Sequence, residues 1–375
     1  MAKLQSLTMA VVFLGAVAAC AQAVSEPRTV DTSAGKVVVE ELVRGLDHPW
    51  GLAFLPDGRL LVTEREGRLR ILTTDGKLSA PISGTPEVRA KGQGGLLDVA
   101  LDPDFRTNRT IYLSYAEDRG GDGATALARA TLGDSELKDL RVIFRQEPHV
   151  SGSGHFGGRI VFQPSGHLFL TTGDRQKFEP AQDLGGHLGK IIRLNKDGSV
   201  PPDNPFVGRA GAKPEIWSYG HRNVQGAAIQ PSTGILWTIE FGPAGGDELN
   251  RPEPGKNYGW PLVSWGNHYD GRDIPDPPTR PDLTDAVKYW NPAISPSGLI
   301  FYTGAMFAPW KDNILIAGLG ASALIRLKLD GGKVVDEERI DLGARIRDVE
   351  QASDGSIYLA TDDSDGSIWR LRPKR

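Results

Sequence analysis

The chain has 375 residues, of which 39% are hydrophobic, so it is long enough and apolar enough to bury a full core and is not a disordered protein. Its 43 Lys and Arg residues are balanced by 47 Asp and Glu residues, which gives a net charge of −4, and no basic stripe runs along the chain. Nucleic acid is therefore excluded as an expected partner.

The first 23 residues have the pattern of an export signal. Lys3 is followed by an apolar run over 9–19 that is too short to span a bilayer, and Ala21-Gln22-Ala23 matches a cleavage site. In a second interpretation, Val17 to Cys20 resembles a bacterial lipobox, and Cys20 would carry a lipid that anchors the protein to a membrane. Both interpretations predict an exported protein of the bacterial periplasm. Cys20 is the only cysteine, so the exported domain contains no disulfide.

A short apolar strand, a tight turn and a second strand recur six times along the chain. The clearest copies are 51–63 and 159–171, each with a Pro-x-Gly turn, and weaker copies cover 98–114, 226–238, 298–317 and 348–361. Hairpins at this spacing, followed by further short strands, predict an all-β fold, namely a six-bladed β-propeller of four-stranded antiparallel blades. Because periodicity does not show ring closure, a pair of stacked β-sandwiches is the structural alternative.

The propeller is predicted as one domain over residues 41–375, after an N-terminal linker over 24–40. No helical period extends over the mature chain, so helices are expected to be short and to lie in loops. A segment rich in Pro, Gly and Asp, from Pro252 to Pro296, is predicted as an insertion between blades four and five. Four of its side chains either wall a sugar pocket or pack as ordinary loop residues: Trp260, Trp265, His268 and Tyr269.

His155 stands among glycines just before a predicted inner strand. An imidazole in such a loop can approach a ligand closely and titrates near neutral pH, which suits a general base, although a purely structural histidine fits the same pattern. Arg159, four residues further on, indicates an anionic ligand. These two residues make the loop a candidate for the channel mouth, where propellers bind small ligands.

The segment 219–226 places a cation and several amides between two glycines. Arg222 offers a planar set of donors suited to carboxylate or quinone oxygens. Asn223 and Gln225 alternate along an extended segment and should point to the same side. We expect this segment to hold a polar group, with a solvated loop as the plainer alternative.

The run from Glu240 to Asn250 contains oxygen donors in a loop that cannot be helical throughout. Backbone carbonyls and the carboxylates of Asp247 and Glu248 are the kind of ligands that Ca²⁺ prefers. The spacing matches no EF-hand loop, so the alternative is that both acids simply solvate a turn.

In combination, these motifs resemble those of the aldose sugar dehydrogenases and soluble glucose dehydrogenases that use pyrroloquinoline quinone. The resemblance extends from about Leu42 to Arg372, and six blades are also the family's architecture. The motifs that carry it are 92–97, His155 with Gly158-Arg159, 173–175, 219–226, 240–250, 257–261 and 345–348.

This resemblance implies roles for individual residues. The catalytic residues would be His155, which removes the proton from the anomeric hydroxyl of an aldose, and Arg222, which stabilises charge on the quinone as hydride arrives. The positions that match cofactor contacts are Gln93, Arg222, Asn223, Gln225, Arg345 and Arg347. The positions that match calcium ligands are the carbonyls of Gly242 and Pro243, with Asp247 and Glu248 near a further calcium site. The electron acceptor is not identified by the sequence.

One position departs from the family pattern. A lysine that soluble glucose dehydrogenase places on the cofactor aligns with Gly320, and loss of one charge-assisted contact weakens binding by about 1.5 to 3 kcal/mol. Lys190 and Arg326 are the cations considered as replacements. Two other classes of function stay open: a calcium-dependent propeller lactonase without a quinone, and a catalytically silent propeller that binds a sugar or a partner.

Overall fold

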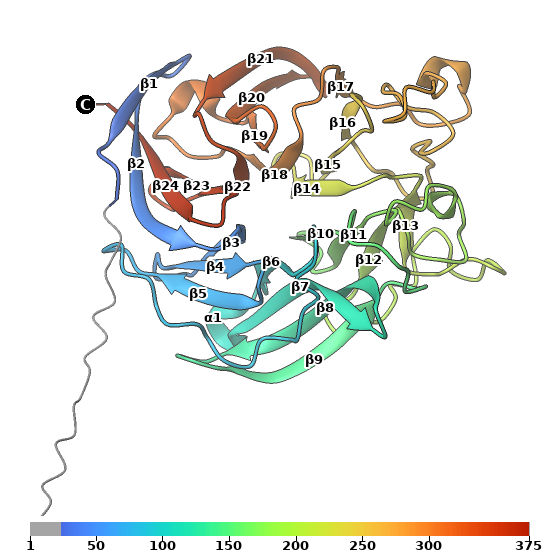
Figure 1. The fold of residues 1–375 in the computed structure, drawn as a ribbon, viewed down its shortest axis with the longest axis horizontal. Coiled ribbons are helices and arrows are strands. Elements are labelled where there is room, and N and C mark those ends of the chain that lie inside the picture. The colour runs from blue at the N-terminus through green and yellow to red at the C-terminus, as the bar shows by residue number, and fades with distance from the viewer. Residues whose placement is uncertain (1–23, 375) are drawn as a thin grey trace, which may run out of the picture.

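The structure is a computed structural model that describes residues 24–374 as six β-sheets arranged in a ring around a central channel (Figure 1). This ring confirms the predicted six-bladed propeller and excludes the pair of stacked sandwiches. The predicted export signal over 1–23, with Cys20, lies outside the described residues. Within residues 24–374, none of the helices has the length and apolar character needed to cross a membrane.

Each blade starts with an inner strand at the channel, and the following strands pair outward in antiparallel order. The first blade has three strands, which differs from the predicted four: β3 (Pro49–Phe54), β4 (Leu60–Glu64) and β5 (Arg68–Leu72). The next four blades have four strands each. They are β6 (Leu96–Leu101), β7 (Thr110–Arg119), β8 (Asp122–Leu132) and β9 (Leu137–Arg145); β10 (Gly157–Phe162), β11 (Leu168–Thr172), β12 (Lys190–Leu194) and β13 (Ile216–Tyr219); β14 (Val224–Ile229), β15 (Leu236–Glu240), β16 (Asp247–Asn250) and β17 (Lys288–Trp290); and β18 (Pro296–Phe301), β19 (Ile314–Gly318), β20 (Ala323–Asp330) and β21 (Lys333–Asp341).

Both ends of the described chain build the last blade. Its inner strands are β22 (Ile346–Gln351), β23 (Ile357–Thr361) and β24 (Gly366–Pro373), and β2 (Gly35–Leu46) pairs along β24 with β1 (Arg28–Thr32) outside it. The predicted linker over 24–40 is therefore wrong. Val37 and Val39 are buried in the core between the fifth and last blades, and the backbone of β2 completes the sheet that closes the ring.

Period-two alternation of apolar side chains produces the core. In β4, Leu61 packs toward the second blade, whereas Leu60 and Val62 pack toward the last blade. Six clusters of this kind each fill the space between two neighbouring blades. Because both faces of every blade are covered in this way, the ring is a rigid support for the loops at its two mouths.

The helices are short and lie in loops, as predicted: α1 (Phe105–Asn108) and the 3₁₀ turns η1 (Glu179–Ala181), η2 (Pro277–Thr279) and η3 (Ala308–Trp310). The long insertion, however, lies within the fourth blade and not between the fourth and fifth. The reason is that β17, which follows it, pairs with β16 as the outer strand of the same sheet, with Asp247 opposite Trp290. The insertion and the loops that enter the inner strands meet at one mouth of the channel, where most of the predicted site residues lie.

Candidate active site

His155 is held in one orientation by the loop that enters β10. Its backbone has a left-handed φ of 52°, and the N–H donates to Oε1 of Gln93 at 2.7 Å. Gly173 packs so closely that a Cβ there would lie 2.1 Å from the His155 carbonyl oxygen. The ring atom Nδ1 lies 2.6 Å from Oδ1 of Asp174. Among the described residues none holds Nε2, so this nitrogen is free to meet a substrate.

The charges around His155 set its protonation. Burial lowers the pKa of His155 below its usual value, and the positive charge of Arg222 lowers it further, against the opposing effect of Asp174. Burial raises the pKa of Asp174, but the hydrogen bond and charge of His155, the Gln176 backbone N–H and the charge of Arg222 together outweigh this and hold the pKa below its usual value. At neutral pH the imidazole is therefore neutral, Nδ1–H donates to the carboxylate, and Nε2 can accept a proton.

Trp260 connects this pair to Arg222. The indole N–H of Trp260 donates to Oδ2 of Asp174 at 2.8 Å, and the guanidinium carbon of Arg222 lies 5.2 Å from the Trp260 ring centroid. Arg222 also donates to the Phe241 carbonyl at 3.3 Å and to the Tyr269 hydroxyl at 3.2 Å. Its Nε is buried without a partner, so the arginine has an unused donor for an acceptor in the site.

Glu240 fixes the segment that carries Arg222. Its Oε2 accepts the backbone N–H of Arg222 at 2.7 Å, and its Oε1 lies 2.9 Å from Nδ1 of His221. The His221 ring in turn stacks on Tyr258 with centroids 4.8 Å apart. This carboxylate thus has a positioning role under the glycine-bounded segment that the sequence singled out.

A cavity of about 200 Å³ brings five of the predicted cofactor positions together. They are Gln93, Asn223, Gln225, Arg345 and Arg347, and the cavity is completed by Trp50, Arg65, Phe241, Ser295, Leu319 and Asp362. Arg222 adjoins the cavity through its hydrogen bond to Phe241. Trp50, Arg65 and Asp362 were missed from the sequence: Trp50 and Arg65 come from the first blade, for which no ligand motif was predicted, and Asp362 lies outside the 345–348 motif of the last blade.

A chain of side-chain hydrogen bonds orders this cavity. Asn223 Oδ1 accepts from Gln225 Nε2 at 3.3 Å, so the two amides lie on the same side, and Gln225 Oε1 accepts from Arg347 Nη1 at 3.1 Å. Arg345 and Arg347 both donate to the same oxygen of Asp362 at 3.0 Å. Burial raises the pKa of Asp362, but the two guanidinium groups outweigh it and lower the pKa to about 2. One carboxylate thus faces two arginines, which leaves positive charge for an anionic ligand.

The carbonyls of Gly242 and Pro243 are available to a cation. They lie in the turn between β15 and β16, and neither accepts a hydrogen bond from any residue of the described part of the chain. Asp247 is not available. Its Oδ1 accepts the Gly242 N–H at 2.9 Å, and its Oδ2 accepts the backbone N–H groups of Ile294 and Ser295 at 2.7 Å each. Asp247 therefore shapes the loop.

Glu248 does not join Asp247 in a shared site, because neighbours on strand β16 face opposite sides of the sheet. Glu248 accepts from Asn250 at 3.2 Å, and burial together with the nearby Glu240 carboxylate raises the pKa of Glu248 well above its usual value. Within residues 24–374, no group of three or more His, Cys, Asp and Glu side chains is placed to hold a metal ion. A calcium ion at this loop would therefore depend on backbone carbonyls.

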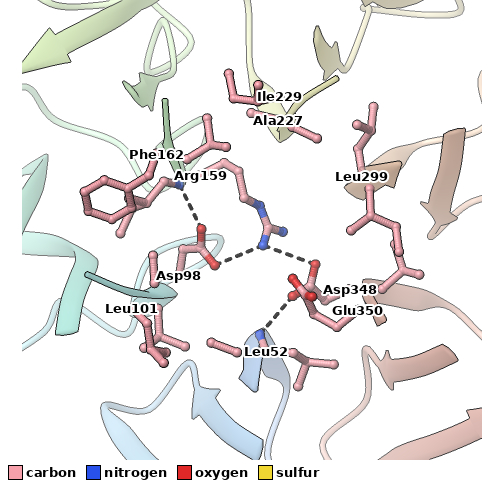
Figure 2. Close-up of a pocket in the computed structure, with 18 of the residues that line it drawn as sticks. Leu52, Asp98, Leu101, Arg159, Phe162, Ala227, Ile229, Leu299, Asp348 and Glu350 are labelled. Carbon is pink, nitrogen blue, oxygen red and sulfur yellow. Dashed lines mark hydrogen bonds and ion pairs between the residues drawn. The ribbon is translucent and has the colours of Figure 1, made fainter. Parts of the chain in front are cut away.

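Arg159 is not available to the anionic ligand that was predicted for it from the sequence. Its Nη1 lies 3.0 Å from Asp98 and 3.1 Å from Asp348, and Figure 2 shows the guanidinium between these two carboxylates inside the channel. The carboxylates come from other blades and neutralise the arginine. This ion group borders a second chamber of about 480 Å³, whose labelled lining includes Leu101, Phe162, Ile229, Leu299 and Glu350 (Figure 2).

Three of the four insertion residues named from the sequence lie near the site. Trp260 and Tyr269 flank Arg222, and His268 lies 5.8 Å from the ring of Phe178, which itself packs on Trp260. Trp265 is elsewhere: it stacks on Tyr289 of β17 with centroids 4.1 Å apart. The insertion thus provides aromatic faces beside Arg222, and only Trp265 is used for packing on its own blade.

The two cations considered as replacements for the family's lysine are both committed elsewhere. Lys190 donates to three backbone carbonyls of the 180–188 loop, and burial lowers the pKa of its amine to about 7. Arg326 pairs with Asp336 and Glu338 of β21. Neither of them lines the cavity.

The propeller has a buried His155–Asp174 pair beside an arginine-lined cavity, and comparison with known proteins gives its family. The family model described as glucose/sorbosone dehydrogenase matches residues 46–370, and the chain belongs to this family. The predicted family and enzyme class are thereby confirmed. The assignment of single residues to catalysis, cofactor binding and metal binding stays a prediction.

The relatives agree over nearly the whole chain. The aldose sugar dehydrogenase YliI of Escherichia coli is 46% identical over 347 residues, which cover 90% of this chain and 93% of that protein. The apo-form structure of the soluble aldose sugar dehydrogenase from Escherichia coli superposes with a TM-score of 0.86 at 44% identity, covering 90% of this chain and 100% of that chain. The PQQ-bound form of aldose sugar dehydrogenase from Streptomyces coelicolor has a TM-score of 0.74 at 30% identity, covering 90% and 98%.

Proposed function

We propose that this protein oxidises aldose sugars at the anomeric carbon to lactones, with pyrroloquinoline quinone (PQQ) and Ca²⁺ as cofactors. The observation that carries the proposal is the position of the His155–Asp174 pair, with Nε2 free, beside a cavity with surplus positive charge. The relatives support it: one is named an aldose sugar dehydrogenase, and another is described as bound to PQQ.

The residues present fit both cofactors. PQQ carries three carboxylates, and the buried Nε atoms of Arg222 and Arg347 have no partner, so the cavity offers unused donors to an anion. Ca²⁺ would be held by the carbonyl oxygens of Gly242 and Pro243. When bound, PQQ supplies a quinone that accepts hydride, and Ca²⁺ supplies a Lewis acid that polarises it.

The chain's own residues then account for the proton. The anomeric hydroxyl of the sugar donates to Nε2 of His155, which takes its proton while the hydrogen on the same carbon leaves with both electrons. That carbon becomes the lactone carbonyl, and the loss of one proton and one hydride balances the two-electron oxidation. Asp174 stabilises the imidazolium that forms. Arg222, held by Trp260 and Phe241, stabilises negative charge as it develops on the acceptor oxygen.

A titration tests the proposal. Metal-stripped protein is titrated with PQQ, with and without Ca²⁺, and the aldose-dependent reduction of an artificial dye is followed. Saturable, calcium-dependent dye reduction is the expected result. A folded protein that reduces no dye across a panel of aldoses would overturn the proposal and favour the lactonase or the silent binder.

We also propose that the protein acts in the periplasm and passes its electrons to an acceptor there. The support is the export pattern over residues 1–23. Fractionation of cells that produce the wild type and Cys20→Ala tests both interpretations of the leader. If the wild type is in the membrane fraction and the variant is not, Cys20 carries a lipid anchor. If both proteins are in the soluble periplasmic fraction, the enzyme is a soluble periplasmic protein. Retention of the wild type in the cytoplasm contradicts export.

A further inference from the structure

Gly320, at the position of the family's lysine, has no room for a side chain. A Cβ there would lie 2.6 Å from Oγ and 3.0 Å from Cβ of Ser295. The loop cannot easily move away, because the Gly320 N–H donates to the Ile294 carbonyl at 3.1 Å and the Leu319 N–H donates to the Ser295 carbonyl at 2.9 Å. The charge that a lysine would bring must therefore come from another part of the chain or be missing.

Arg65 is a further cation at the same cavity, and no sequence motif indicated it. It lies in the turn between β4 and β5 and lines the cavity together with Arg345 and Arg347. Its Nη1 donates to the Gly92 carbonyl at 3.0 Å, whereas its Nε is buried without a partner. In the part of the chain that the structure describes, no carboxylate lies within ion-pair distance of Arg65.

The charges at the cavity do not balance. Three guanidinium groups, of Arg65, Arg345 and Arg347, meet the single carboxylate of Asp362, which is already shared by two of them. Burial lowers the pKa of Arg347, Asp362 opposes this shift, and the charges of Arg65 and Arg345 lower the pKa further. The arginines therefore repel one another in the free protein, and an anion in the cavity would relieve that repulsion.

We propose that Arg65 binds a carboxylate of PQQ and supplies the positive charge that this chain lacks at Gly320. The inference rests on the proposed function, since it takes PQQ as the anion. It adds a cofactor-binding residue from the first blade, whereas the other cavity arginines, Arg345 and Arg347, come from the last blade. The cavity then offers three guanidinium groups to a ligand with three carboxylates.

A plainer role for Arg65 is to anchor the loop that carries Gln93. Gly92, which accepts from Arg65, precedes Gln93, and Gln93 accepts the backbone N–H of His155. Two substitutions separate the roles. Arg65→Gln keeps a donor for the Gly92 carbonyl but removes the charge, whereas Arg65→Lys keeps the charge. If Arg65 binds the cofactor, the positive charge at position 65 should decide the affinity for PQQ. If Arg65 only anchors the loop, the hydrogen-bond donor to the Gly92 carbonyl should decide it.

The test is the dissociation constant for PQQ, measured by calorimetry on the calcium-loaded protein without PQQ and repeated at increasing salt. We expect Arg65→Gln to weaken binding by about 10- to 100-fold and to reduce its salt dependence, and Arg65→Lys to weaken it by less than about 10-fold. Arg59→Gln is the matched control, because Arg59 lies in the same blade and pairs with Asp57 at an exposed turn. Its affinity should equal that of the wild type.

Each other outcome has a defined meaning. If Arg65→Gln binds PQQ within twofold of the wild type while Arg347→Gln binds weakly, the inference about Arg65 is wrong and the proposed function stands. If the wild type itself does not bind PQQ, the proposed function fails. Thermal unfolding of Arg65→Gln without PQQ is the structural check: an unchanged or higher Tm agrees with relieved repulsion, and a clearly lower Tm shows that Arg65 is an anchor and contradicts the inference.

Discussion

Asp174→Asn removes the charge beside His155 with almost no change of volume. In the structure, Oδ1 of Asp174 meets both His155 Nδ1 and the Gln176 backbone N–H, and Oδ2 accepts from Trp260. An asparagine has one oxygen for these three donors, so at least one donor faces its NH₂ group. When that donor is His155, its Nδ1 becomes an acceptor, the proton moves to Nε2, and the base is blocked.

The expected loss follows from these contacts. One charge-assisted hydrogen bond contributes about 1.5 to 3 kcal/mol, which corresponds to about 10- to 150-fold in rate. The fraction of molecules with the wrong tautomer adds to this, so we expect kcat to fall by about 10²- to 10⁴-fold. Affinity for PQQ should change little, since Asp174 does not line the cofactor cavity.

The pH dependence gives an independent check with a defined sign. His155 acts as a base only when neutral, so kcat rises as pH passes upward through its pKa. Burial already places this pKa below the usual histidine value, and the Asp174 carboxylate opposes that shift. Removing the carboxylate lowers the pKa of His155 further. The acid limb of the profile should therefore move to lower pH while the plateau falls.

The assay is dye reduction at saturating PQQ, Ca²⁺ and aldose across a range of pH. Asp183→Asn is the control, because Asp183 is an exposed acid of the neighbouring loop whose carboxylate accepts only a local backbone N–H, from Gly185. This control should keep the wild-type kcat. A plateau in Asp174→Asn within twofold of the wild type, or an acid limb displaced to higher pH, would refute the reasoning.

Three further predictions concern stability and calcium. Glu350→Gln should raise Tm at alkaline pH but not at acid pH. Burial and the Asp348 charge raise the pKa of Glu350 to about 8, so the stability that is present below the ordinary Glu pKa is lost as the pH rises through about 8. The variant has no carboxylate at this position and avoids this loss. Calorimetry at several pH values checks it, and a pH-independent difference in Tm contradicts it. Deletion of residues 24–40 should abolish cooperative unfolding, because β2 closes the ring; circular dichroism that shows a transition at the wild-type Tm would mean that the segment is dispensable. Chelation of Ca²⁺ should abolish dye reduction and added Ca²⁺ should restore it, since the Gly242 and Pro243 carbonyls have no other partner among the described residues; a full rate in chelator would rule out the metal site.

The blades were predictable because each contains a local hairpin, in which a recognisable turn sequence lies between two apolar strands. Ring closure was not. β2 pairs with β24 although the two strands are more than 300 residues apart in sequence, as the pair Val39 and Leu371 shows. A strand whose only inner partner lies at the other end of the chain has no local partner, so it was predicted as a linker. The position of the insertion was wrong for a related reason: β17 has three residues, too few to show a strand period.

The site was predictable where a motif is contiguous and unpredictable where side chains from different blades meet. Asn223 and Gln225 lie together because they alternate on one strand. The pairing of His155 with Asp174 joins two loops, and the motif around Asp174 gave it no role. Arg159 was assigned to an anionic ligand because its charge stands near His155 in sequence, but Asp98 and Asp348 from other blades neutralise it. Long-range neutralisation of this kind leaves no local pattern.

The most direct test of the central claim is a single-turnover measurement on His155→Gln. Protein loaded with PQQ and Ca²⁺ is mixed with an aldose in a stopped-flow instrument, and the absorbance of the cofactor reports its reduction. If Nε2 of His155 takes the proton of the anomeric hydroxyl, the variant binds PQQ with the wild-type dissociation constant, and its reduction rate falls by about 10²- to 10⁴-fold. Reduction at the wild-type rate in a fully loaded variant would contradict the account.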